Sequence, residues 1–275
     1  MILPSPDKPG QRHDDLPAES YFGLGGYSST DIKNWLTMTP KEWRYWKQNG
    51  IEPSEAMRLG SAVHCAVLEP DEYESRFAVY SGDRRTGKAY REWAESVGNR
   101  EELSRGSGRT VEAVIDYLEA NERLHKLIKS GSPEVSFLHL DLQGRLRKAR
   151  CDWIGDIGNM SAVIDLKTTW SLDDRHLEKT LYERHYHVQA AWYLDVVGAV
   201  NGREPDAFVI IWVATKPPID MRLTIVSKDA IDLGRKAYQV ALDQLSDAQA
   251  RDYFPGYSLE PTVLDLPRWA YTKDD

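Results

Sequence analysis

The first half of the chain carries the apolar spacing and the capping residues of several helices. The segment 39–42 (Thr-Pro-Lys-Glu) combines both ends of a capping box with proline at the first helical position, and it predicts a helix that ends at Asn49-Gly50. Ser54 is placed to cap a second helix that runs to about Glu69. We also expect a short helix around 90–97 and a long amphipathic helix that Thr110 caps and that runs through Lys129.

Strand-like apolar runs follow Gly131. The run 162–164 (Ala-Val-Ile) is typical of a buried strand, and the two segments before it are expected to form a hairpin around Gln143-Gly144. This order of elements predicts an α/β fold, with a mixed central sheet flanked by helices. The expected strands cover 134–142, 145–154, 162–168, 207–214 and 221–226, and the expected helices cover 173–182, 185–199 and 229–253.

Length and composition limit the domain organisation. The chain has 275 residues, enough for one large domain or two small ones, and no boundary is visible after about residue 21. Residues 1–20 are rich in proline and aspartate, so we expect them to be disordered and residues 21–275 to form a single domain.

The sequence lacks the signals of a membrane or secreted protein. No apolar run approaches the roughly 20 residues that span a bilayer, and the N-terminus has no signal-peptide core, so we expect a cytoplasmic protein without a membrane partner. Two cysteines, Cys65 and Cys151, exclude a four-cysteine zinc or iron–sulfur site.

The charge balance does not decide the partner. The formal net charge is −8, but net charge governs long-range steering rather than the local potential of a groove. Two basic clusters are candidates for nucleic-acid contacts, although either could equally be solvated surface charge; they are Arg145, Arg147, Lys148 and Arg150, and then Arg84, Arg85, Lys88 and Arg91.

The clearest candidate chemistry follows the strand at 162–164. Asp165 and Lys167 share one face of that strand, with the carbonyl of Leu166 between them. Asp152, near the end of the preceding strand, could add a second carboxylate to the same site. Two carboxylates can hold a hard cation such as Mg²⁺, and a lysine beside them can orient or deprotonate a water. An exposed ion pair is the simpler alternative, but open α/β sheets place their sites where buried strands surface.

The helix after Ser54 offers one further ligand. Gly60 and His64 lie four residues apart and therefore on one helix face. Glycine costs a helix about 1 kcal/mol relative to alanine, so its presence indicates that something approaches closely there. A lone histidine on an apolar helix is usually a core or surface residue, but beside this glycine His64 becomes a candidate metal ligand.

Taken together, these motifs justify a family resemblance. The chain resembles the PD-(D/E)XK nuclease superfamily and, more closely, the nuclease domain of RecE-type exodeoxyribonuclease VIII, over nearly all residues from about Tyr21. One departure is Cys151, which stands where the superfamily has proline. The motifs that carry the resemblance are 59–64 (Leu-Gly-Ser-Ala-Val-His), 68–70 (Leu-Glu-Pro), 84–86 (Arg-Arg-Thr), 165–169 (Asp-Leu-Lys-Thr-Thr), 186–189 (Tyr-His-Val-Gln) and 266–270 (Leu-Pro-Arg-Trp-Ala).

The resemblance implies a fold, an activity and a set of residue roles. The fold would contain the PD-(D/E)XK, restriction-endonuclease-like core. The activity would be Mg²⁺-dependent digestion of linear double-stranded DNA from the 5′ end, with Mn²⁺ as a substitute. The metal ligands would be His64, Asp152, Asp165 and the Leu166 carbonyl, with Glu134 as a weaker candidate; Lys167 would be the catalytic lysine, and Gln189 and Tyr193 would flank the DNA end.

Partners and alternatives follow from the same resemblance. Such enzymes are ring-shaped homo-oligomers that leave 3′ single strands for recombination and pass them to a single-strand annealing protein. A catalytically silent DNA-binding scaffold is an alternative, although both Asp165 and Lys167 are present. A structure- or site-specific endonuclease on the same core also remains open. We further expect Arg84, Arg85 and Lys88 to contact backbone phosphate, because they lie between glycines in a stretch without apolar periodicity.

Overall fold

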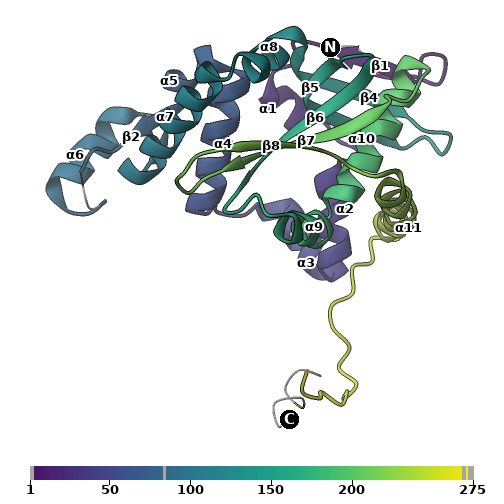
Figure 1. The fold of residues 1–275 in the computed structure, drawn as a ribbon. Helices are drawn as coiled ribbons and strands as arrows, with labels where there is room; N and C mark the ends of the chain where they lie inside the picture. Colours follow the sequence, from purple (N-terminus) through teal and green to yellow (C-terminus); the bar gives the residue numbers. More distant parts are fainter. Residues whose placement is uncertain (1–2, 83–84, 268–270, 272–275) are drawn as a thin grey trace.

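A six-stranded mixed sheet forms the centre of the protein (Figure 1). The computed structural model describes residues 3–82, 85–267 and 271. The strand order is β1-β4-β5-β6-β7-β8, and every neighbouring pair is antiparallel except the parallel pair β6–β7. The expected α/β class is therefore confirmed. The strands are β1 Gly10–His13, β4 Ser132–Leu140, β5 Leu146–Ile157, β6 Met160–Thr169, β7 Ala207–Ala214 and β8 Met221–Ile225.

Helices cover both faces of this sheet, because strand β7 has apolar side chains on both of its faces. All eight residues of β7 are buried, and successive side chains point to opposite faces. Phe208, Ile210 and Trp212 pack into one apolar cluster, whereas Val209 and Ile211 pack into the other. The first cluster is closed by α2 Ser29–Thr37, α10 Tyr186–Asn201 and α11 Lys228–Ala250, and the second by α4 Glu55–Leu68, α7 Arg105–Ala120 and α8 Glu122–Ser130.

The remaining elements surround this core. A small parallel sheet of β2 and β3 lies with α6 on the far side of α4 from the central sheet (Figure 1). No described helix is both long and apolar enough to cross a bilayer. The bounds are α1 Ala18–Gly23, α3 Pro40–Asn49, the 3-10 turn η1 Pro70–Glu72, α5 Tyr73–Arg76, β2 Phe77–Val79, α6 Gly87–Val97, β3 Glu101–Leu103 and α9 Asp174–Glu183.

Helix capping explains one confirmed and one wrong expectation. The capping box of α3 is present, because Thr39 N donates to Glu42 Oε2 at 2.8 Å and Glu42 N donates to Thr39 Oγ1 at 3.3 Å. The single helix expected from Thr110 through Lys129 is wrong. Ser104 caps α7 earlier, and Asn121 ends it and caps α8 by accepting from Leu124 N at 3.1 Å. Asparagine competes for backbone groups in this way and favours caps over helix interiors.

The N-terminal segment corrects another expectation. We expected residues 1–20 to be disordered, but Gly10–His13 forms β1 and pairs antiparallel with β4. The polar composition obscured this strand, because β1 is an edge strand that covers the exposed backbone groups of β4. Gly10 permits the fit, since a Cβ there would lie 3.1 Å from Cα of Val200 in α10. Leu16 is also buried.

Candidate functional site

Strands β5 and β6 diverge at the centre of the sheet, and the opening between them contains the site. Their antiparallel register runs from Ile157 to Trp153, which pairs with Ile164, and stops there. Beyond this pair, Leu166 N donates to Asp152 Oδ2 at 2.8 Å instead of to a β5 carbonyl. The N–H and C=O groups of one strand residue face the same neighbouring strand, so the Leu166 carbonyl also faces this opening. Asp152 thus occupies the space that a paired backbone would fill.

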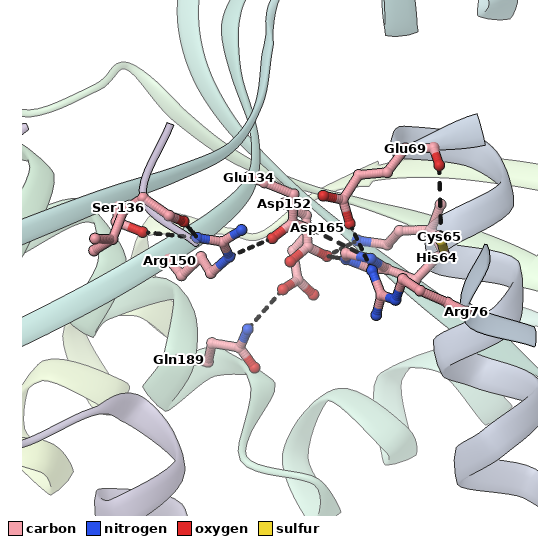
Figure 2. A network of polar contacts seen from close by, with 12 residues as sticks. His64, Cys65, Glu69, Arg76, Glu134, Ser136, Arg150, Asp152, Asp165 and Gln189 are labelled. Atoms are coloured by element: carbon pink, nitrogen blue, oxygen red, sulfur yellow. Dashed lines mark hydrogen bonds and ion pairs between the residues drawn. The ribbon is translucent and has the colours of Figure 1, made fainter. Parts of the chain in front are cut away.

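Three side chains from three elements form the first group in the opening. His64 of α4 lies between two carboxylates: its Nε2 is 3.0 Å from Asp152 Oδ2, and its Nδ1 is 3.3 Å from Glu134 Oε1 (Figure 2). One ligand atom from each of the three residues lies within 4.8 Å of the others. The close approach expected at Gly60 is explained by β6, because a Cβ there would lie 3.4 Å from Thr168 Oγ1.

The backbone of Glu134 is strained at this point. Its φ of 54° is in the left-handed region, which is rare for residues other than glycine and costs of order 1–3 kcal/mol. The pairing of β4 with β5 skips Glu134, and the turned backbone directs its carboxylate toward His64. Glu134 therefore lies closer to the centre of the site than its weaker sequence evidence indicated.

Arg150 holds the same carboxylate from the opposite side. Its Nε donates to Glu134 Oε2 at 2.5 Å, and its Nη1 donates to Ser136 Oγ at 3.1 Å (Figure 2). The same Nη1 donates to the Leu16 carbonyl at 2.7 Å. The two carboxylate oxygens of Glu134 are thus divided between Arg150 and His64. Arg150 is two residues before Asp152 and shares its strand face, which is the signal that sequence reasoning could have used.

A second group surrounds Asp165 on β6. Its side chain is buried; Oδ2 forms an ion pair with Lys167 Nζ, and Oδ1 accepts from Gln189 Nε2 of α10 at 2.6 Å. The Gln189 carbonyl oxygen in turn accepts from Lys33 Nζ of α2 at 2.7 Å. The ammonium groups of Lys33 and Lys167 lie 5.5 and 5.1 Å from the ring centroid of Tyr186. Neither Lys33 nor Tyr186 was assigned a role from the sequence.

The electrostatics of the two groups differ. Burial alone would disfavour the charged form of Asp152, but the neighbouring charge and hydrogen bond of His64 outweigh burial and lower its pKa to about 2. Burial also opposes the charged form of His64, yet Asp152 and Glu134 raise its pKa to about 9. Burial raises the pKa of Asp165, and the charge of Asp152 adds to this effect against the opposing charge of Lys167.

The first group has the donor set of a divalent-cation site. Carboxylate oxygens suit hard cations, and an imidazole nitrogen extends the choice to Mn²⁺. We expected Asp152 and Asp165 to form the carboxylate pair, whereas His64, Glu134 and Asp152 form the close cluster among the described residues. Asp165 lies beside this cluster (Figure 2) and its charge interacts with Asp152. The residues therefore fit a cation that His64, Glu134 and Asp152 hold, with Asp165 and the Leu166 carbonyl at its edge.

The residues expected to contact DNA have different environments. Gln189 is buried and turned toward Asp165. Tyr193 is also buried and packs edge-on against Phe208, and its contact with DNA stays a prediction. Arg85 forms an ion pair with Glu55 at 2.7 Å, and Lys88 is exposed at 3.5 Å from Glu92. Arg84 lies outside the described residues.

The basic stretch before Asp152 is largely structural. Lys148 is buried and donates to the backbone carbonyls of Tyr21 and Leu24. The guanidinium of Arg147 lies 4.6 Å from the ring centroid of Trp192, and Arg145 donates to Asp141. These side chains are occupied within the protein, so the stretch is not an open basic surface.

Known proteins show similarity in family and in fold. The model of a family described as a PDDEXK-like domain of unknown function (DUF3799) matches residues 28–265. A crystal structure described as a putative exonuclease from Eubacterium rectale has a TM-score of 0.64 at 16% identity, and the match covers 95% of this chain and 99% of that chain. The structure of SSO0001 has a TM-score of 0.30 at 16% identity, covering 78% and 85% of the two chains. No curated protein matches the chain.

Proposed function

Because the chain belongs to the family of PDDEXK-like domains, we propose that it is a metal-dependent nuclease that digests double-stranded DNA from linear ends. One observation carries this proposal: the divergence of β5 from β6 brings Asp152, Asp165 and Lys167 together at one opening in the sheet. A carboxylate pair with an adjacent ammonium suits phosphodiester hydrolysis, because this reaction needs a positioned water and stabilisation of charge on the phosphoryl oxygens.

The proposed cofactor is Mg²⁺, with Mn²⁺ as a substitute. His64, Glu134 and Asp152 would hold the ion, together with Asp165 and the Leu166 carbonyl. A bound divalent cation supplies Lewis-acid stabilisation of the charge that develops on the phosphate. Arg150 supports this site indirectly, since it keeps one oxygen of Glu134 occupied and leaves the other facing His64.

Lys167 has the role of a fixed cation in this proposal. Burial opposes its charge, but the charges of Asp165 and Asp152 outweigh burial and raise its pKa. The ammonium, which is paired with Asp165, can donate to the attacking water or to a phosphate oxygen, so we assign Lys167 to orientation of the water and to charge neutralisation.

The direction of digestion is the finer part of the proposal. We propose degradation of linear duplex from 5′ ends to leave 3′ single strands for recombination, with an annealing protein as partner and a ring-shaped homo-oligomer as the assembly. Support comes from the RecE-type motifs outside the core, such as 59–64 and 68–70. The related fold of the protein described as a putative exonuclease supports digestion from DNA ends in general and carries no information on direction.

End-labelled DNA tests this direction. Linear duplex labelled at either the 5′ or the 3′ terminus, and a closed circular duplex, are incubated with the protein and Mg²⁺. We expect early release of the 5′ label, retention of the 3′ label and an intact circle. Nicking of the circle would instead assign the protein to endonucleases on the same core, and early loss of the 3′ label would reverse the proposed direction.

A further inference from the structure

Lys33 reaches the site from α2, an element that none of the motifs above includes. Its Nζ donates to Gln189 Oε1 at 2.7 Å, although the two residues are 156 positions apart in the chain. Helix α2 lies beside α10, which carries Gln189 (Figure 1). No ion pair with a carboxylate involves Lys33 among the described residues, so it does not take part in ordinary surface charge pairing. Its ammonium is directed at one amide.

The hydrogen bonds on the two sides of that amide determine its orientation. An ammonium can only donate and an ionised carboxylate can only accept, whereas a glutamine side chain has one accepting oxygen and one donating NH₂ group. Lys33 on one side and Asp165 on the other therefore permit only one arrangement: Oε1 faces Lys33, and Nε2 faces Asp165 Oδ1 at 2.6 Å. Without Lys33, the amide oxygen loses its charged donor, and only the bond from Nε2 to Asp165 Oδ1 still holds the amide.

The position of Lys33 is itself constrained. The ring of Tyr186 lies 5.5 Å from its ammonium and 5.1 Å from that of Lys167, and aromatic faces attract cations at such distances. Oδ2 of Asp165 is therefore paired with the ammonium of Lys167, and Oδ1 accepts from the Gln189 amide that Lys33 holds. The orientation of the carboxylate thus depends on two lysines, Lys167 directly and Lys33 through Gln189.

We propose that Lys33 is a positioning residue of the nuclease site, acting through Gln189 to hold the Asp165 carboxylate in its reactive orientation. This inference rests on the proposed function and extends it to a residue outside the strands and motifs of the core. Lys33 itself need not touch DNA or metal. Outer groups that orient a functional carboxylate in this way typically affect activity by about 10–100-fold.

A double-mutant cycle tests the proposed route. Lys33→Met, Gln189→Leu and the double variant are compared with wild type for kcat and KM on linear duplex, for melting temperature, and for binding of DNA ends in EDTA. Lys41→Met makes the same chemical change at an exposed lysine of the neighbouring helix α3 and is the matched control. Lys33→Arg retains a charged donor and serves as the conservative variant.

We expect Lys33→Met to lower kcat about 10–100-fold while KM and DNA binding in EDTA stay close to wild type. In the Gln189→Leu background, Lys33→Met should have no further effect, because the route is already interrupted. Lys33→Arg should recover part of kcat, and Lys41→Met should match wild type.

Three results would overturn the inference. One is wild-type kcat in Lys33→Met, and another is a full multiplicative loss in the double variant. The third is weakened DNA binding in EDTA at unchanged kcat, which would make Lys33 a phosphate contact. If Lys33→Met does not fold, the conservative variant decides, since Lys33→Arg with no activity in a folded protein contradicts positioning by a charged donor. Failure of the proposed function is distinct, because wild type itself would then be inactive.

Discussion

Two lysines have a pKa that burial lowers, Lys33 at the site and Lys148 beside α1, and they differ in the groups to which they donate. Burial lowers the pKa of Lys33 to about 8, with a further contribution from the charge of Lys167. Burial lowers the pKa of Lys148 to about 8 as well, with a contribution from Lys47. Lys148 donates to two backbone carbonyls, at 2.9 Å to Tyr21 and at 2.7 Å to Leu24. Lys33 donates to a side-chain amide that continues to Asp165.

The partners of these lysines, rather than their burial, separate structural from functional roles. Backbone carbonyls cannot move without moving the chain, so Lys148 fastens residues 21–24 to the sheet. A side-chain amide and a carboxylate can change orientation, so the cations at Asp165 influence which way a reactive group points. The comparison predicts that variants in the site change the rate and that variants beneath α1 change the stability.

The largest effect is expected at the centre of the site. Asp165→Ala and Lys167→Ala should each reduce cleavage by about 10²–10³-fold or more, because each removes a charge from the reacting centre. The free energy of unfolding of Asp165→Ala should stay unchanged or rise, since the change removes one of two carboxylates that repel each other. Lys167→Ala should lower it, because the buried Asp165 loses its ion-pair partner. Cleavage rates, denaturant unfolding and DNA-end binding measure these effects. A near wild-type rate in either variant would mean that the site is assigned wrongly.

Lys148→Met should give the opposite result. The change removes the ammonium donor from the carbonyls of Tyr21 and Leu24, of which only Tyr21 O keeps a backbone donor, Leu24 N, and relief of the buried charge offsets this loss only in part. We expect the free energy of unfolding to fall by about 1–3 kcal/mol while kcat of the folded protein stays close to wild type. A large loss of kcat with unchanged stability would remove the distinction between the two regions.

Stability at alkaline pH sharpens the same distinction. The pKa of Lys148 is about 8 in the folded protein and about 10.4 in an unfolded chain, so the unfolded state binds more protons between these values. Stability from this group is therefore present above pH 10.4 and is lost as pH falls through 8. The difference in unfolding free energy between wild type and Lys148→Met should grow in favour of wild type from pH 8 to 10. A difference in unfolding free energy that stays constant from pH 8 to 10 would contradict the lowered pKa of Lys148.

The smallest effect is expected outside both regions, at Arg85. Its ion pair with Glu55 already occupies the guanidinium in part, so a phosphate contact there competes with a protein partner. Arg85→Ala should weaken DNA binding slightly and reduce the slope of log affinity against log salt by at most about 0.9. Lys88→Ala, at an exposed residue, provides the companion measurement. Unchanged affinity and slope in both variants would show that the two side chains are only surface charge.

The central strands and most helices were predictable because their signals are local. Strand β7 was expected at the bounds observed, since its eight apolar residues are an unbroken buried run. Strand β1 was not, because its stability comes from the edge of β4 and from the close fit of Gly10 against α10, neither of which its composition records. The break between α7 and α8 was missed at a single capping residue, Asn121.

The sequence predicted the site residues that lie within one motif, but not those that reach the site only through the folded backbone or the packing of distant helices. Asp165 and Lys167 lie two apart on one strand, so their common face follows from the alternation of side chains. Glu134 reaches His64 only because of a positive φ in β4. Lys33 has no neighbour in sequence that indicates its role, and its position depends on the packing of α2 against α10.

Metal dependence tests the central claim most directly. Wild-type protein is stripped with EDTA, and cleavage of linear duplex is measured without metal and after addition of Mg²⁺, Mn²⁺ or Ca²⁺, with Asp152→Asn as the site variant. We expect no cleavage after stripping, recovery with Mg²⁺ or Mn²⁺, and no recovery with Ca²⁺, whose coordination is looser. Asp152→Asn should stay inactive with every ion. Full activity of the stripped protein, or recovery of Asp152→Asn to the wild-type rate, would contradict a metal-dependent nuclease at this site.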